Sequence, residues 1–258
     1  MLPRRAVATL LVTALAAAAA PARAGSPSDP KAVEIADQVM QALGGRDHWD
    51  ALVGLRWSFG ASVNDTVRGT PRRHSWNKRT GEHRVEGTLR DGTKFCFIHT
   101  LGDTLNGKAW MNGRPVEGDS LHKLLKNAEA MWVNDEYWLC MPYKLRDPGV
   151  TLQYDGETKD GDVTYDKLSM TFDHVGLTPG DHYWLFVNRA NHRIERWEMV
   201  LEGQQPPPVG YTWDGWTEHD GLWFASAHRA IGGPRKVNVF TDPVETVSAF
   251  RADEFRAP

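Results

Sequence analysis

Residues 132 to 149 read WVNDEYWLCMPYKLRDPG, and they lie where a helical pattern gives way to a strand pattern. Pro142, together with Asp147, Pro148 and Gly149, interrupts any helix that enters this stretch. Because short segments separated by turn residues follow, we predict that a helix ends here and that antiparallel strands begin. The helix itself is predicted from apolar side chains at helical spacing, which are Leu121, Leu124, Leu125, Ala128, Met131 and Trp132.

Strand-like segments lie on both sides of this helix. Those before it cover residues 55–63, 72–78, 83–90, 93–100 and 106–113. Those after it cover residues 150–157, 163–172, 182–188, 192–201, 209–220, 222–231 and 235–240. A leading helix is predicted over residues 26–45, with Asp29 as its N-cap. The pattern predicts a mainly β, α+β fold: a large curved antiparallel sheet, or half-barrel, of about ten strands covered by two or more helices.

The first 24 residues have the pattern of a signal peptide. Arg4 and Arg5 precede an Ala-rich apolar run, and residues 22–24 form a small-x-small cleavage site. We therefore expect secretion into a bacterial periplasm, with residues 25–258 forming a single domain. No second apolar run is long enough to span a membrane, so we expect no integral membrane segment after cleavage.

Charge and cysteine content narrow the functional classes. The formal net charge is −3, and the predicted signal peptide contributes three arginines and no acid, so the rest of the chain is more acidic. A mildly acidic chain lacks the basic surface that nucleic acids require, and we expect no nucleic-acid partner. Cys96 and Cys140 are the two cysteines. Both lie in apolar segments, so the sequence leaves open whether they form a disulfide or remain buried thiols.

Eleven tryptophans are many for a chain of 258 residues. Large aromatic side chains fill a core, but they also line cavities that accept apolar ligands, and both interpretations remain open. Alternation in residues 194–201 places Trp197, Met199 and Leu201 on one face of a strand. The candidate ligand-binding residues are Trp132, Tyr137, Trp138, Met141, Tyr143, Trp184, Trp197 and Trp213.

The sequence contains no recognisable catalytic or metal-binding pattern. The ten histidines are dispersed, none of their spacings is diagnostic of a metal site, and no serine has a nucleophile-elbow context. We therefore expect no catalytic residue, no metal and no cofactor. If the protein were an enzyme, the polar residues to test first would be those at the rim of the predicted cavity, namely Asp135, Lys144, Asp147, Asp181 and His182.

Two segments carry a resemblance to a protein family. The blocks YWLCMPYKLRDPG, within residues 134–156, and VGLTPGDHYW, within residues 168–188, resemble the YWLxMPYKLxDPG and VGLTPGDxYW blocks of a family of secreted bacterial proteins of unassigned function. That family is similar in architecture to the periplasmic lipoprotein carriers of the LolA/LolB type. The resemblance implies a half-barrel with helices as a lid over an apolar interior that binds acyl chains. It transfers no catalytic residues.

These observations together predict a non-enzymatic periplasmic protein. It would bind a lipid, an acyl chain or another apolar small molecule inside the half-barrel, in envelope lipid or lipoprotein handling. Two alternatives stay open: an envelope hydrolase with its site at the mouth of the barrel, and an envelope protein-interaction module that uses exposed aromatic side chains. The sequence names no protein partner.

Overall fold

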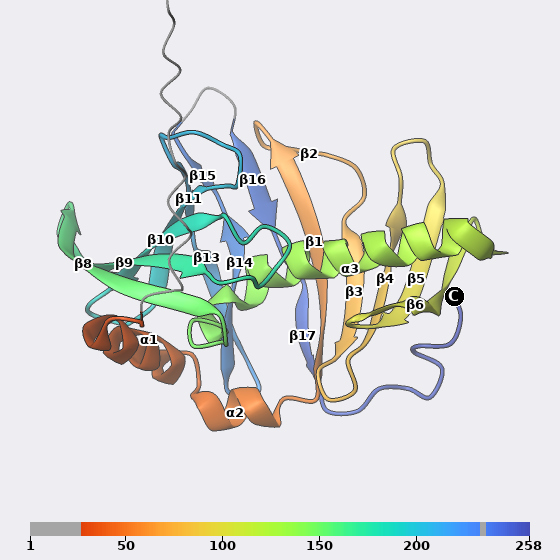
Figure 1. Ribbon diagram of the computed structural model, residues 1–258, viewed down its shortest axis with the longest axis horizontal. Coiled ribbons are helices and arrows are strands. Elements are labelled where there is room, and N and C mark those ends of the chain that lie inside the picture. The colour runs from red at the N-terminus through yellow and green to blue at the C-terminus, as the bar shows by residue number, and fades with distance from the viewer. Residues whose placement is uncertain (1–26, 233–235) are drawn as a thin grey trace, which may run out of the picture.

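The computed structural model describes residues 27–232 and 236–258 (Figure 1). The predicted signal peptide lies outside these residues. Within them the helices are α1 (Pro30–Ala42), α2 (Arg46–Ala51) and α3 (Gly118–Cys140), and the short 3-10 helix η1 (Met141–Tyr143) continues from α3. As predicted, Asp29 caps α1, since its side chain accepts a hydrogen bond from the Lys31 backbone N–H at 2.7 Å.

Eleven strands form the larger of two antiparallel sheets. They are β1 (Gly54–Val63), β2 (Thr66–Val67), β3 (Arg72–Asn77), β4 (Glu82–Thr88), β5 (Lys94–Thr100), β6 (Asp103–Met111), β7 (Arg114–Val116), β13 (Asp214–His219), β14 (Leu222–His228), β16 (Val237–Phe240) and β17 (Val244–Val247). The strand order is β13-β14-β16-β1-β3-β4-β5-β6-β7, with β2 and β17 also paired to β1. β1 is therefore the central strand, and it joins segments from both ends of the chain.

Six strands form the smaller sheet. They are β8 (Val150–Asp160), β9 (Val163–Phe172), β10 (His182–Asn188), β11 (Ile194–Val200), β12 (Val209–Thr212) and β15 (Ala230–Ile231). Their order is β15-β12-β11-β10-β9-β8. The mainly β, antiparallel fold with helices is thus confirmed. The described residues contain seventeen strands rather than about ten. Two predicted segments, 209–220 and 222–231, are each divided into two strands, and the short strands β2, β7 and β17 lie outside the predicted segments.

The predicted strand over residues 209–220 is divided at residue 213 into β12 and β13. The segment 209–220 leaves the six-stranded sheet after β12 and enters the eleven-stranded sheet as β13. Trp213, between them, is fully buried. Gly215 follows with φ +67°, a left-handed conformation that glycine adopts without steric cost. The change of sheet therefore places an aromatic side chain at the junction of the two sheets.

Helix α3 lies across both sheets (Figure 1). Its first half packs on the eleven-stranded sheet, where Ala128 is fully buried beside Phe95, Phe97 and Ala109. Leu125 is also fully buried, and it lies close to Gly107 of β6. Its second half contributes Leu139 and Cys140 to the main core. Both cysteines are buried and free, so the open question of a disulfide is answered: they do not pair.

Tyr143, just after α3, connects three segments of the main core. Its ring stacks on Trp49 of α2 with centroids 4.3 Å apart. Its hydroxyl lies 2.9 Å from the Leu43 carbonyl and 2.8 Å from the Trp223 carbonyl, and it accepts the Trp223 N–H at 3.0 Å. These contacts connect the end of α1, the end of α3 and β14.

Replacing Tyr143 with phenylalanine tests this connection. The Tyr143→Phe variant should lose about 1 to 2 kcal/mol of unfolding free energy in urea denaturation, because buried backbone groups lose their hydroxyl partner. The matched control is Tyr165→Phe, whose hydroxyl donates to Glu195 from a partly exposed position. Equal losses in the two variants would contradict the connecting role.

Candidate functional site

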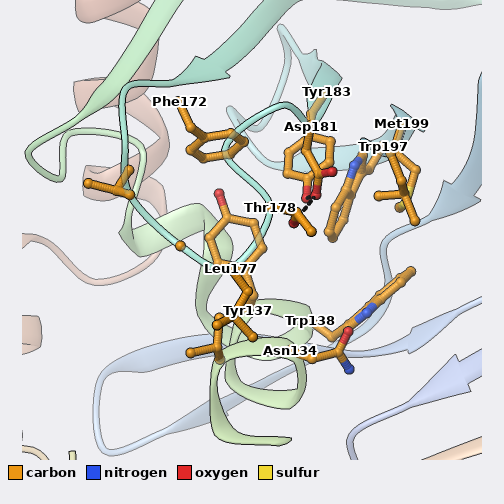
Figure 2. Close-up of a pocket in the computed structure, with 14 residues that line it drawn as sticks. Asn134, Tyr137, Trp138, Phe172, Leu177, Thr178, Asp181, Tyr183, Trp197 and Met199 are labelled. Carbon is orange, nitrogen blue, oxygen red and sulfur yellow. Dashed lines mark hydrogen bonds between the residues drawn. The ribbon is translucent and has the colours of Figure 1, made fainter. Parts of the chain in front are cut away.

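A pocket of about 320 Å³ lies between α3 and the six-stranded sheet (Figure 2). Helix α3, strands β9 to β11 and the loop between β9 and β10 surround it. The lining residues are Val133, Asn134, Tyr137, Trp138, Phe172, Val175, Gly176, Leu177, Thr178, Asp181, Tyr183, Trp197, Met199 and Leu201. The volume is within the range of small-molecule sites, and the lining is mostly apolar and aromatic.

Aromatic rings form one continuous wall of the pocket. The Trp197 ring centroid lies 4.8 Å from that of Trp138, 5.0 Å from that of Tyr183 and 6.0 Å from that of Tyr137. Tyr183 on β10 pairs directly with Met199 on β11, so alternating side chains of adjacent strands point the same way. The rings thus come from one face of the sheet and from the last turns of α3.

The loop between β9 and β10 is held by Asp181. One carboxylate oxygen accepts hydrogen bonds from the Thr178 hydroxyl at 2.8 Å and the Tyr183 hydroxyl at 2.6 Å. The other accepts from the Glu202 backbone N–H at 2.7 Å. Burial and this contact with Asp181 raise the pKa of Tyr183, so its hydroxyl keeps its proton and remains a donor.

The pocket contains four of the residues predicted from the sequence. Tyr137, Trp138 and Trp197 belong to its aromatic wall, and Asp181 lies under its loop. A larger hollow of about 590 Å³ exists elsewhere, but Arg73, Glu86 and Lys94 are among the residues that line it. We therefore take the aromatic pocket as the candidate ligand-binding site.

The other predicted aromatic and apolar residues lie elsewhere. Met141, Tyr143 and Trp213 are fully buried core residues. Trp132 packs edge-to-face on Trp76. Trp184 is adjacent to Tyr183 in the sequence and points to the opposite face of β10, because side chains alternate along a strand.

The predicted polar rim does not come together. The side chain of Asp135, a residue of α3, is buried against β3. Lys144 forms an ion pair with Asp147 at 3.0 Å. His182 stacks on Trp184, 4.2 Å between centroids, on the face of β10 away from the pocket. Of the five, only Asp181 lines the pocket. The five residues therefore form no common constellation.

Several lining residues were not predicted as ligand-binding. Met199 and Leu201 share a strand face with Trp197, which the alternation already indicated. Residues 175–178 belong to the VGLTPGD block, which carries the family resemblance and looks like an ordinary turn. No local pattern distinguishes a turn that covers a pocket from one that only joins two strands.

A second buried polar feature, a chain of three histidines, lies on the other side of α3. His74 on β3, His83 on β4 and His99 on β5 are all buried. The rings are joined in sequence: Nδ1 of His74 lies 3.0 Å from Nε2 of His83, and Nδ1 of His83 lies 3.0 Å from Nε2 of His99. The ring nitrogens point at one another, and no group of three or more His, Cys, Asp or Glu in residues 27–232 and 236–258 is arranged to hold a metal ion.

Both ends of the histidine chain meet acids of α3. Asp135 lies 2.9 Å from Nε2 of His74 and forms two hydrogen bonds of 2.7 Å with Arg72. At the other end Nδ1 of His99 lies 3.3 Å from Glu129, without hydrogen-bond geometry. Burial alone would raise the pKa of Asp135, but the hydrogen bonds from His74 and Arg72 lower it below its ordinary value.

The ionised Asp135 fixes the tautomers along the chain. It accepts the Nε2–H of His74, which leaves Nδ1 of that ring as an acceptor for His83. His83 therefore donates its Nε2–H to Nδ1 of His74, and His99 donates its Nε2–H to Nδ1 of His83. The Nδ1 lone pair of His99 then faces Glu129, whose pKa burial raises.

The histidines are held neutral. Burial lowers the pKa of His83 well below 6.5, and neighbouring His74 and His99 lower it further. Burial likewise lowers the pKa of His74 and His99. The unfolded chain binds protons on these rings below pH 6.5 while the folded chain does not, so acid favours unfolding.

Known proteins match this chain in fold but not in sequence. No protein-family model matches the sequence, and no curated protein matches it. The crystal structure of a DUF1329 family protein from Desulfovibrio piger is similar with a TM-score of 0.50 at 11% identity, over 88% of this chain and 98% of that chain. A LolA superfamily protein from Nitrosomonas europaea is similar with a TM-score of 0.51 at 8% identity, over 87% of this chain and 96% of that chain. The likeness shows the fold alone, and it supports the predicted LolA-like architecture.

Among the helices of residues 27–232 and 236–258, none is both long enough and apolar enough to cross a membrane.

Replacing His83 with glutamine tests the histidine chain. The unfolding free energy of the unaltered protein should fall as the pH drops from 6.5 to 5, at up to about 1.4 kcal/mol per pH unit for each neutral buried histidine. His83→Gln should be less stable at pH 7.5 and should show a shallower fall, because glutamine does not titrate. Denaturant titrations across this pH range measure both quantities.

The control is His122→Gln on the exposed surface of α3, which should leave the pH dependence unchanged. A His83→Gln curve that runs parallel to that of the unaltered protein would show that the histidine chain does not titrate as inferred.

Proposed function

We propose that this protein binds a lipid or another apolar small molecule in the pocket between α3 and strands β9 to β11, without transforming it. The observation that carries the proposal is the aromatic wall of Tyr137, Trp138, Tyr183 and Trp197, which borders about 320 Å³ of space. A cavity of this size with an apolar lining favours apolar ligands, because their surface leaves water on binding.

The likeness to a LolA superfamily fold supports the same function, although fold alone does not determine it. The signal-peptide pattern of residues 1–24 supports a location in the periplasm, and we propose a role there in envelope lipid or lipoprotein handling. Binding is favoured over hydrolysis because the five polar candidates form no common cluster, and because Asp181 already accepts three hydrogen bonds.

Binding of the apolar fluorescent probe diphenylhexatriene tests the proposal. The protein should increase the fluorescence of the probe in a saturable, one-site titration. Leu177→Asp should weaken binding on the order of tenfold, because it places a charge at the edge of an apolar site. Leu177 is 57% exposed, so the substitution should leave the fold intact, as circular dichroism would verify.

The matched control is Leu105→Asp, since Leu105 is 69% exposed and lies on β6 away from the pocket. This variant should bind the probe as the unaltered protein does. An absence of saturable binding, or equal weakening by both substitutions, would count against the pocket as the binding site.

A further inference from the structure

The pocket has a distinctive charge composition. Its fourteen described lining residues include no lysine, arginine or histidine, and their one carboxylate belongs to Asp181. His174, in the same loop, does not line the pocket, and its side chain is 93% exposed. A ligand carboxylate inside the pocket would therefore lose water without gaining a cationic partner, which is strongly unfavourable.

A cationic ligand group would not find a partner either. Both oxygens of Asp181 are already engaged, by Thr178, Tyr183 and the Glu202 backbone N–H, and the residue is only 4% exposed. A cation would have to displace these contacts and open the loop. The described lining thus offers a carboxylate no partner, and it offers a cation only a carboxylate that is buried and already hydrogen-bonded.

Two polar groups of the lining have hydrogen-bonding capacity to spare. The indole N–H of Trp197 is a buried donor without a hydrogen-bond partner among the described residues, and the Tyr137 hydroxyl is only weakly engaged. The Tyr137 hydroxyl makes its hydrogen bond to the thioether sulfur of Met170 at 3.8 Å, and sulfur is a weak acceptor. Figure 2 shows the Tyr137 ring extending from α3 toward Phe172, with the hydroxyl at its far end. Burial raises the pKa of Tyr137, and the nearby Tyr183, Glu136, Asp147 and Asp181 raise it further, so this hydroxyl is a neutral donor.

We infer that the pocket takes an uncharged ligand: a hydrocarbon chain or ring system that carries a hydrogen-bonding oxygen, such as an alcohol, ester or ketone, bound to the Tyr137 hydroxyl. The inference rests on the proposed function and specifies the ligand class. Free fatty acids in their ionised form are excluded, because the described lining offers their carboxylate no cation. The Tyr137 hydroxyl is the group that we assign to the ligand oxygen, because it can both donate and accept a hydrogen bond, whereas the Trp197 indole N–H can only donate.

Three ligands with the same decyl chain test the charge selectivity. Decanol, decanoate and decyltrimethylammonium are titrated at pH 7.5 against diphenylhexatriene bound to the protein, below the concentration at which each ligand forms micelles. Decanol should displace the probe, and both ions should bind about tenfold more weakly or worse. Either ion binding as tightly as decanol would overturn the assignment of an uncharged ligand.

The Tyr137→Phe variant tests the hydrogen bond. The substitution should lower the affinity for decanol by about threefold to tenfold relative to the affinity for diphenylhexatriene, which carries no hydrogen-bonding group. Tyr165→Phe, on β9 and not among the lining residues, is the matched control and should leave the ratio of the two affinities unchanged. An unchanged ratio in Tyr137→Phe would overturn the role of its hydroxyl.

The proposed function and the inferred ligand class are contradicted by different results. If the unaltered protein does not bind diphenylhexatriene, the proposed function itself is wrong. If it binds the probe but takes decanoate as well as decanol, only the inferred ligand class is wrong.

Discussion

The buried carboxylate of Asp135 is the constraint on which the position of α3 depends. A charge that is removed from water is costly unless it is paired and hydrogen-bonded. Asp135 is hydrogen-bonded by the neighbouring Asn134 amide, but its one cationic partner among the described residues is Arg72 on β3, and His74 on the same strand completes the set. The helix therefore cannot slide along the sheet or rotate on it without leaving this charge unpaired. Apolar packing around Leu125 and Ala128 draws α3 onto the sheet, but such packing is not directional and does not by itself specify a register.

The pairing of Asp135 also positions part of the pocket lining. Asn134, Tyr137 and Trp138 line the pocket and are close neighbours of Asp135 in α3. Adjacent residues of a helix point in different directions, so one turn directs a carboxylate to the eleven-stranded sheet and aromatic rings to the six-stranded one. The two sheets meet at Trp213, whose ring lies 4.5 Å from that of His228 and 5.7 Å from that of Trp197. The pocket wall is thus built on a junction that is itself packed.

Much of the fold follows from local patterns, whereas the site depends on register between strands. The apolar stripe from Leu121 to Trp132 and the N-cap at Asp29 predicted two of the helices, because helical spacing and capping are properties of neighbouring residues. The histidine chain was not predictable in this way. His74, His83 and His99 look dispersed, and they come together because the turns between β3, β4 and β5 set His83 directly opposite His99. Likewise Tyr183 rather than Trp184 reaches the pocket, a one-residue difference that hydrophobicity does not decide.

Strand β1 has a consequence for how the chain reaches its native state. Residues 54–57 of β1 pair with residues 244–247, and residues 60–63 pair with residues 237–240. The central strand thus acquires its partners on one side only after residues 237–247 have been made. Contacts between such distant segments are slow to form, since the entropy of closing a long loop is lost before they stabilise anything. Until β16 and β17 have formed, one side of β1 exposes backbone groups without sheet partners, so the eleven-stranded sheet is completed from its middle last.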